Sequence, residues 1–83
     1  MNIINNITYD EIQNLHKEYK NLNNIDDYKK EYKELLEKKL MNYDHIFKYK
    51  KNPELRKNDI DYLRFLNIRI MYIEYQIYKL IKR

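Results

Sequence analysis

The chain has 83 residues, 17 Lys and Arg against 13 Asp and Glu, a formal net charge of +4, and no cysteine or glycine. A chain of this length forms one domain, and the lack of cysteine excludes a disulfide framework and a thiolate metal site. The charge favours weak attraction to polyanions but says nothing about the fold. Packing or association must therefore supply the stability.

The ends of the chain carry no recognisable targeting or membrane signal. The start, MNIINNI, lacks the basic region and long apolar run of a secretory signal. The apolar-rich stretch from Ile68 to Ile81 is interrupted by Arg69, Glu74 and Lys79, whereas a bilayer span needs about 20 predominantly apolar residues. We therefore expect a cytoplasmic protein without a membrane partner.

A capping box predicts where the first helix begins. Thr8 precedes Glu11 by three residues, so its hydroxyl can accept from the Glu11 amide while the carboxylate returns to the Thr8 amide. Ile12, Leu15 and Tyr19 then recur at helical spacing. This predicts an N-terminal cap segment over residues 1–8 and a short helix over 9–22, ended by the stretch NLNNID.

The second helix is predicted over residues 25–51, with Asn24 as its cap. Asp26 and Asp27 lie at the positive end of its dipole, and lysines lie at the negative end. A break near Asn42 would divide it and produce a fourth helix. Its single apolar stripe comprises Ile25, Tyr28, Tyr32, Leu35, Leu36, Tyr43, Ile46 and Phe47.

The last helix is predicted over residues 53–83 if Asn52 caps it, with Pro53 at the first helical position, or over 59–83 if it starts at Asn58. It has two apolar faces on roughly opposite sides, and such a helix belongs between two neighbours. We therefore predict an all-α single domain over residues 1–83, a small three-helix or four-helix up-down bundle dominated by a long antiparallel helical hairpin. The first face is a heptad seam of Leu63, Leu66, Ile70, Ile73, Ile77 and Leu80, and the second comprises Phe65, Ile68, Tyr72 and Tyr75.

The first helix is too short to cover this hairpin, at roughly 20 Å against roughly 36–40 Å for the other two. An uncovered apolar surface is expected at the far end of the hairpin, and such surfaces mark sites of association. The predicted partner-binding residues are Tyr43, Ile46, Phe47, Phe65, Ile68 and Tyr72. The predicted basic rim is Lys50, Lys51, Arg56 and Lys57. The alternative is a self-sufficient monomer, because Asn, Lys, Ile and Tyr make up more than half of the chain and a compositional bias would supply exposed tyrosines.

The sequence offers little for catalysis. The usual Ser and Cys nucleophiles are absent, and a phosphate-binding loop would lack glycine. His16 and His45 have no metal-ligand spacing and are expected to be solvated. We therefore expect no enzyme activity, cofactor, metal or small-molecule substrate.

Two functions fit these features. The first is a non-enzymatic protein–protein interaction module of the adaptor, immunity-type or inhibitor kind, whose partner is another protein or a second copy. The alternative is a nucleic-acid-binding helical protein, in which lysines neutralise phosphates and tyrosines stack on bases.

Overall fold

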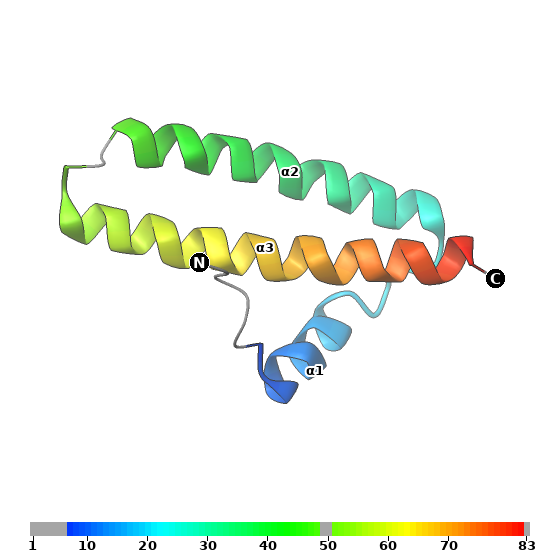
Figure 1. Cartoon of the computed structure of the whole chain (residues 1–83). Helices are drawn as coiled ribbons and strands as arrows, with labels where there is room; N and C mark the ends of the chain where they lie inside the picture. The colour runs from blue at the N-terminus through cyan, green and yellow to red at the C-terminus, as the bar shows by residue number, and fades with distance from the viewer. Residues whose placement is uncertain (1–6, 49–50, 83) are drawn as a thin grey trace.

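A computed structural model describes residues 7–48 and 51–82, with the backbone alone at Leu55, and contains the helices α1 (Tyr9–Glu18), α2 (Ile25–Lys48) and α3 (Pro53–Ile81). Helices α2 and α3 pack together along their length, and α1 lies on the other side of α3, below its second half (Figure 1). No strand is found in the described part of the chain. The prediction of an all-helical fold is confirmed.

Side chains cap the first two helices as the sequence predicts. The Glu11 amide donates to Thr8 Oγ1 at 3.1 Å, and the Thr8 amide donates to Glu11 Oε1 at 3.3 Å, which completes the capping box. At α2, the Asp27 amide donates to Asn24 Oδ1 at 3.0 Å. These bonds satisfy backbone donors that have no partner within a helix, and so they set where each helix begins.

Helices α2 and α3 are both continuous. Helix α3 begins at Pro53 rather than near residue 59, and the Asn52 carbonyl accepts from the Arg56 amide at 2.9 Å. Helix α2 runs unbroken through Asn42 to Lys48, and residues 49–50 lie outside the described part. The residue suspected of breaking α2 is therefore an interior helical residue, and the structure has no fourth helix within its described residues.

Helix α1 ends at Glu18, four residues before the predicted end. The backbone leaves the helical conformation at Tyr19, which has φ −106° and ψ 16°. The Tyr19 ring is buried, and its hydroxyl donates to Glu31 Oε1 of α2 at 3.2 Å. Burial and the neighbouring Glu31 carboxylate raise the pKa of Tyr19. The Tyr19 side chain thus joins the end of α1 to α2.

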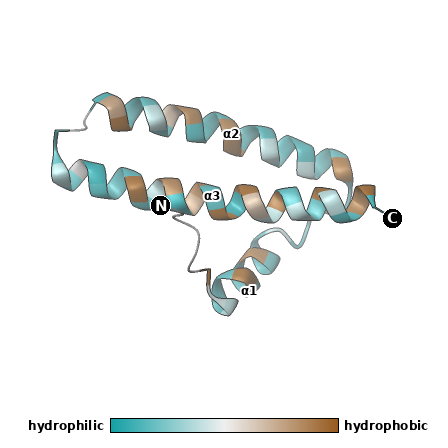
Figure 2. Cartoon of the chain, viewed as in Figure 1, coloured by the Kyte–Doolittle hydropathy of each residue, from teal (hydrophilic) through white to brown (hydrophobic). Residues whose placement is uncertain are grey.

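The seam between α2 and α3 forms most of the core. Hydrophobic residues recur along the whole of α3, shown in brown in Figure 2. Leu66 and Ile73 are fully buried, and Leu35 of α2 packs in the same cluster. All six residues of the predicted heptad seam are buried or half-buried, namely Leu63, Leu66, Ile70, Ile73, Ile77 and Leu80.

Polar contacts also join the two long helices. Asn42 is buried, and its Nδ2 donates to the Asp59 carbonyl at 3.1 Å. His45 Nδ1 lies 2.6 Å from Asp59 Oδ2. Nearer the other end of the hairpin, the Tyr32 hydroxyl donates to Glu74 Oε1 at 3.2 Å. Later residues of α2 thus meet earlier residues of α3, so the helices run antiparallel and these bonds select one register.

Two arginines of α3 hold α1 in place. Arg64 donates to both carboxylate oxygens of Glu11, at 3.0 and 3.1 Å. Arg69 donates to both oxygens of Glu18, at 2.8 and 3.0 Å. Hydrogen bonding from Arg64 lowers the pKa of Glu11. Forked pairs of this kind fix orientation, and two of them set the position of α1 along α3.

An aromatic contact follows the second of these ion pairs along the chain. The rings of Tyr72 and Tyr19 stack with centroids 5.7 Å apart, and the Tyr72 hydroxyl lies 2.7 Å from Nδ1 of His16. Ile68 is only 3 % exposed and belongs to the same cluster. The second apolar face of α3 is therefore covered in part by α1.

We predict that Leu66→Ala lowers the free energy of unfolding by about 2–5 kcal/mol, because it leaves a cavity in a fully packed core. Leu40→Ala makes the same chemical change at a side chain that is 66 % exposed, and we expect less than about 1 kcal/mol. Urea unfolding followed by far-UV circular dichroism measures both. Equal losses in the two variants would contradict the placement of the core.

We predict that α1 loosens as the pH falls below about 4.5, the ordinary pKa of Glu11. The folded state lowers this pKa, so the stabilisation is complete above the unfolded value and is lost as the pH falls through the folded value. Amide hydrogen exchange in α1 measures the loosening.

Glu11→Gln is the informative variant for this prediction, because glutamine keeps the capping box but lacks the charge that Arg64 binds. We expect α1 to exchange faster at pH 7 and to lose most of its acid sensitivity. Asp10→Asn is the matched control, since it removes a neighbouring carboxylate in the same helical turn. If both variants behave alike, the dipole of α1 rather than Arg64 is responsible.

Candidate protein-interaction surface

The structure removes two residues from the predicted interaction surface. Ile68 is buried under α1, and Tyr72 is half-buried by its stacking on Tyr19. The expectation that they lie uncovered is corrected, because α1 reaches this part of α3. Ile46 is half-buried, and three of the predicted residues stay exposed, namely Tyr43, Phe47 and Phe65.

Tyr43 and Phe47 share one side of the hairpin with Ile60. Tyr43 follows Tyr32 by 11 residues, or about three helical turns, so both project from the same side of α2. Tyr32 bonds to Glu74, which marks the matching side of α3. Ile60 precedes Glu74 by 14 residues, close to four turns, and therefore projects from that side as well.

Phe65 projects from the opposite side. It follows Ile60 by five residues, a rotation of about 140° around α3. Its ring stacks on Tyr62 with centroids 5.8 Å apart, and the Arg69 guanidinium lies 3.4 Å from the ring centroid. Because Arg69 also binds Glu18, Phe65 supports the attachment of α1. The structure does not bring Phe65 together with Tyr43 and Phe47.

The surface around Tyr43 and Phe47 also includes exposed residues that were not predicted to bind a partner. Its members on α2 follow each other at intervals of 4, 3 and 4 residues, the spacing of a helix-packing seam. Phe47 is 73 % exposed, and the others range from about one-third to two-thirds exposed. We call this surface the apolar flank, and it comprises Leu36, Leu40, Tyr43 and Phe47 of α2 with Ile60 of α3.

The apolar flank could have been recognised from the sequence in part. Leu40 was left out of the predicted stripe, yet it completes the spacing between Leu36 and Tyr43. The single apolar stripe predicted for α2 consists of two stripes in the structure. One of them faces α3 and is buried at Tyr28 and Leu35, and the other faces sideways and is exposed. Periodicity within α2 separates them, because Leu35 and Leu36 lie about 100° apart.

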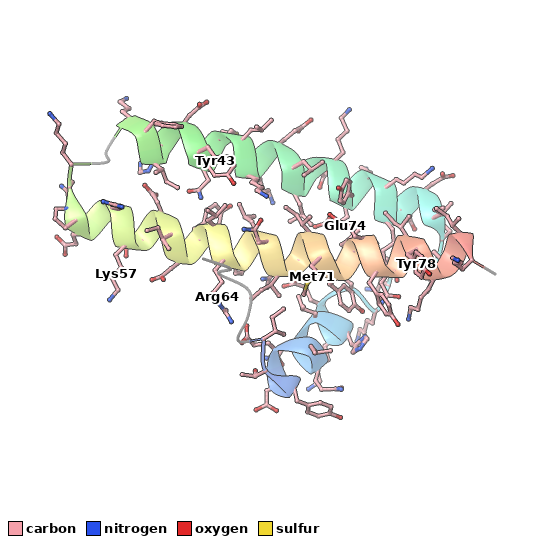
Figure 3. All side chains as sticks on the ribbon, in the orientation of Figure 1. Tyr43, Lys57, Arg64, Met71, Glu74 and Tyr78 are labelled. Carbon is pink, nitrogen blue, oxygen red and sulfur yellow. The ribbon has the colours of Figure 1, made fainter. Side chains whose placement is uncertain are left out.

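The predicted basic rim is only partly adjacent to this surface. Lys51, Arg56 and Lys57 are exposed and line a shallow hollow with Pro53, Ile60 and the carboxylate of Asp61 at the start of α3. Arg56 precedes Ile60 by one turn and so borders the apolar flank. Lys57 projects away from α2 (Figure 3). Lys50, also predicted for the rim, lies outside the described residues.

A separate hollow, with mostly apolar walls, lies between α1 and α3. Its volume is about 440 Å³, and its walls include Ile12 of α1 with Met71 and Tyr75 of α3. The polar side chains on its wall are His16, Gln76 and Lys79. Because His16 already bonds to Tyr72, the hollow offers packing space rather than a set of convergent catalytic groups.

The sequence predicts solvated histidines, but in the structure both histidines also form hydrogen bonds to other helices. His16 and His45 are exposed at one edge, yet each bonds across a helix interface, to Tyr72 and Asp59 respectively. The described residues contain no group of three or more side chains suited to hold a metal ion. No helix within those residues has both the length and the apolar character needed to cross a membrane.

Comparison with known proteins adds no family to this description. No family model, curated protein or solved structure matches the chain. The apolar flank is therefore interpreted from its own geometry and charge.

Proposed function

We propose that this protein is a non-enzymatic, cytoplasmic interaction module of the adaptor, immunity-type or inhibitor kind, which binds another protein through the apolar flank. The supporting observation is the run of exposed apolar side chains from Leu36 to Phe47 at helix-packing spacing. At the exposed fractions found, the five side chains leave on the order of 400 Å² of apolar surface. Patches of this size on small proteins are often functional.

The position of the apolar flank also supports this proposal. Its most exposed members, Leu40 and Phe47, contribute little to the core, which is built on Leu35, Leu66 and Ile73. Large apolar side chains that do not stabilise the fold cost solubility unless another surface covers them. A binding partner supplies such a surface.

Nucleic-acid binding is the second candidate. Its support is the hollow at the start of α3, where Lys51, Arg56 and Lys57 lie around one depression. Lysines and arginines so placed could contact phosphates without reading sequence. The exposed aromatic side chains of the apolar flank and the side chain of Lys57 project from different sides of the hairpin. A nucleic acid bound at the basic hollow would therefore not explain why these aromatic side chains are exposed.

We predict that Phe47→Ser abolishes partner capture while the helical content stays unchanged, because the side chain is largely exposed. Loss of one buried aromatic contact corresponds to about 1.5–3 kcal/mol of binding free energy, or at least about a tenfold loss of affinity. The measurement is affinity purification from the native host with tagged full-length protein and nuclease treatment, followed by direct binding assays with the protein recovered.

Phe65→Ser is the matched control, since it makes the same substitution on the opposite side of α3. We expect it to retain the partner. Equal loss in the two variants would contradict the assignment to the apolar flank. Capture that disappears on nuclease treatment, together with steep loss of DNA or RNA affinity in salt, would favour the nucleic-acid function instead.

A further inference from the structure

We propose that the occupant of the apolar flank is an acidic amphipathic helix of another protein, an inference that rests on the proposed function. The shape of the surface is the first argument. From Leu36 to Phe47 the stripe extends about 16 Å along α2, or three helical turns. A surface with intervals of 4, 3 and 4 residues fits the same intervals on a facing helix, as in helix-in-groove recognition.

The charge around the apolar flank is the second argument. Lys29 lies on the line of the stripe seven residues before Leu36, and Lys33 lies one turn before it. Lys39 stands beside the stripe with its Nζ 5.9 Å from the ring centroid of Tyr43, and Arg56 borders Ile60. The surface is thus edged by basic groups on both helices.

Carboxylates also lie near the apolar flank, but away from its centre. Glu74 lies on the same side of the hairpin, and its Oε1 accepts from the Tyr32 hydroxyl. Glu37 and Asp44 are exposed but project from the side of α2 opposite α3, about 70–90° from the centre of the stripe. A partner whose carboxylates lie opposite Lys29, Lys33 and Arg56 would therefore meet complementary charge.

A second copy of the chain fits the shape but not the charge. The intervals read the same in both directions, so an antiparallel two-fold pairing would place Leu36 opposite Phe47 and Leu40 opposite Tyr43. The same rotation would bring Glu37 of one copy near Asp44 of the other, on both sides of the two-fold axis. Carboxylates would therefore meet in two places, which disfavours self-association.

The test uses two synthetic helical peptides of about 20 residues that differ only in the residues flanking a leucine stripe with the intervals of α2. One peptide carries Glu at these positions, and the other carries Lys. Fluorescence anisotropy with the full-length protein measures binding at low and physiological salt. We expect the Glu peptide to bind at least about tenfold more tightly, and its affinity to fall with added salt.

Three variants locate the binding. Leu40→Asp should weaken the Glu peptide at least about tenfold, because it places a charge in the centre of the apolar flank. The pair Lys29→Glu and Lys33→Glu should reverse the preference toward the Lys peptide. Phe65→Ser, on the opposite side, should leave binding unchanged. Circular dichroism confirms that each variant stays helical.

Equal affinity for the two peptides, or no binding of either, would overturn the acidic-helix inference. Sedimentation of the free protein separates this failure from failure of the proposed function. A dimer that Leu40→Asp dissociates would identify a second copy as the occupant, so the flank would still be a protein-binding surface. A monomer that binds neither peptide and loses no captured partner in Phe47→Ser would refute both proposals.

Discussion

Helix α3 must be covered on two opposite sides, and the rest of the structure depends on how the chain meets that requirement. Its heptad seam packs on α2, while Ile68 and Tyr72 turn the other way and pack beside α1. In a chain of 83 residues this leaves α3 as the central element and the other helices as its covers. A small domain without disulfides gains its stability from such shared burial.

The two covers are held by different physical means. Helix α2 is long and continuous. It buries Tyr28 and Leu35 in the core, and Asn42 and His45 bond to Asp59 near its far end. Helix α1 has only 10 residues, buries Leu15 in the core and is joined to α3 by two arginine–carboxylate pairs. Exposed ion pairs contribute little to stability but define geometry. The ion pairs therefore set the orientation of α1, while Leu15 joins it to the core.

Much of this arrangement follows from local sequence patterns, and the errors have one cause. Capping residues, the heptad seam and the two faces of α3 depend on spacing within a helix, so they can be predicted. Asn42 was suspected of breaking α2 because the stretch MNYDH could cap a further helix. Its actual partner, Asp59, belongs to another helix and leaves no local signal. For the same reason, the prediction grouped Phe65 with Tyr43 and Phe47, which the structure does not bring together. Periodicity places Tyr43 and Phe65 around their own helix axes, but only a contact between helices, such as that of Tyr32 with Glu74, aligns the two axes.

The separation of folding and binding residues gives the apolar flank its meaning. On α2, Leu35 and Leu36 are neighbours in sequence, yet one is fully enclosed by α3 and the other faces solvent beside Leu40. Substitutions along the exposed stripe can change what the protein binds without opening the core, because few core contacts depend on them. The basic edge contributed by Lys29, Lys33 and Arg56 then acts on partner choice rather than on stability, since exposed charges steer association and repel like-charged surfaces. Helix α2 can therefore stabilise the hairpin through one of its faces and select a binding partner through the neighbouring face.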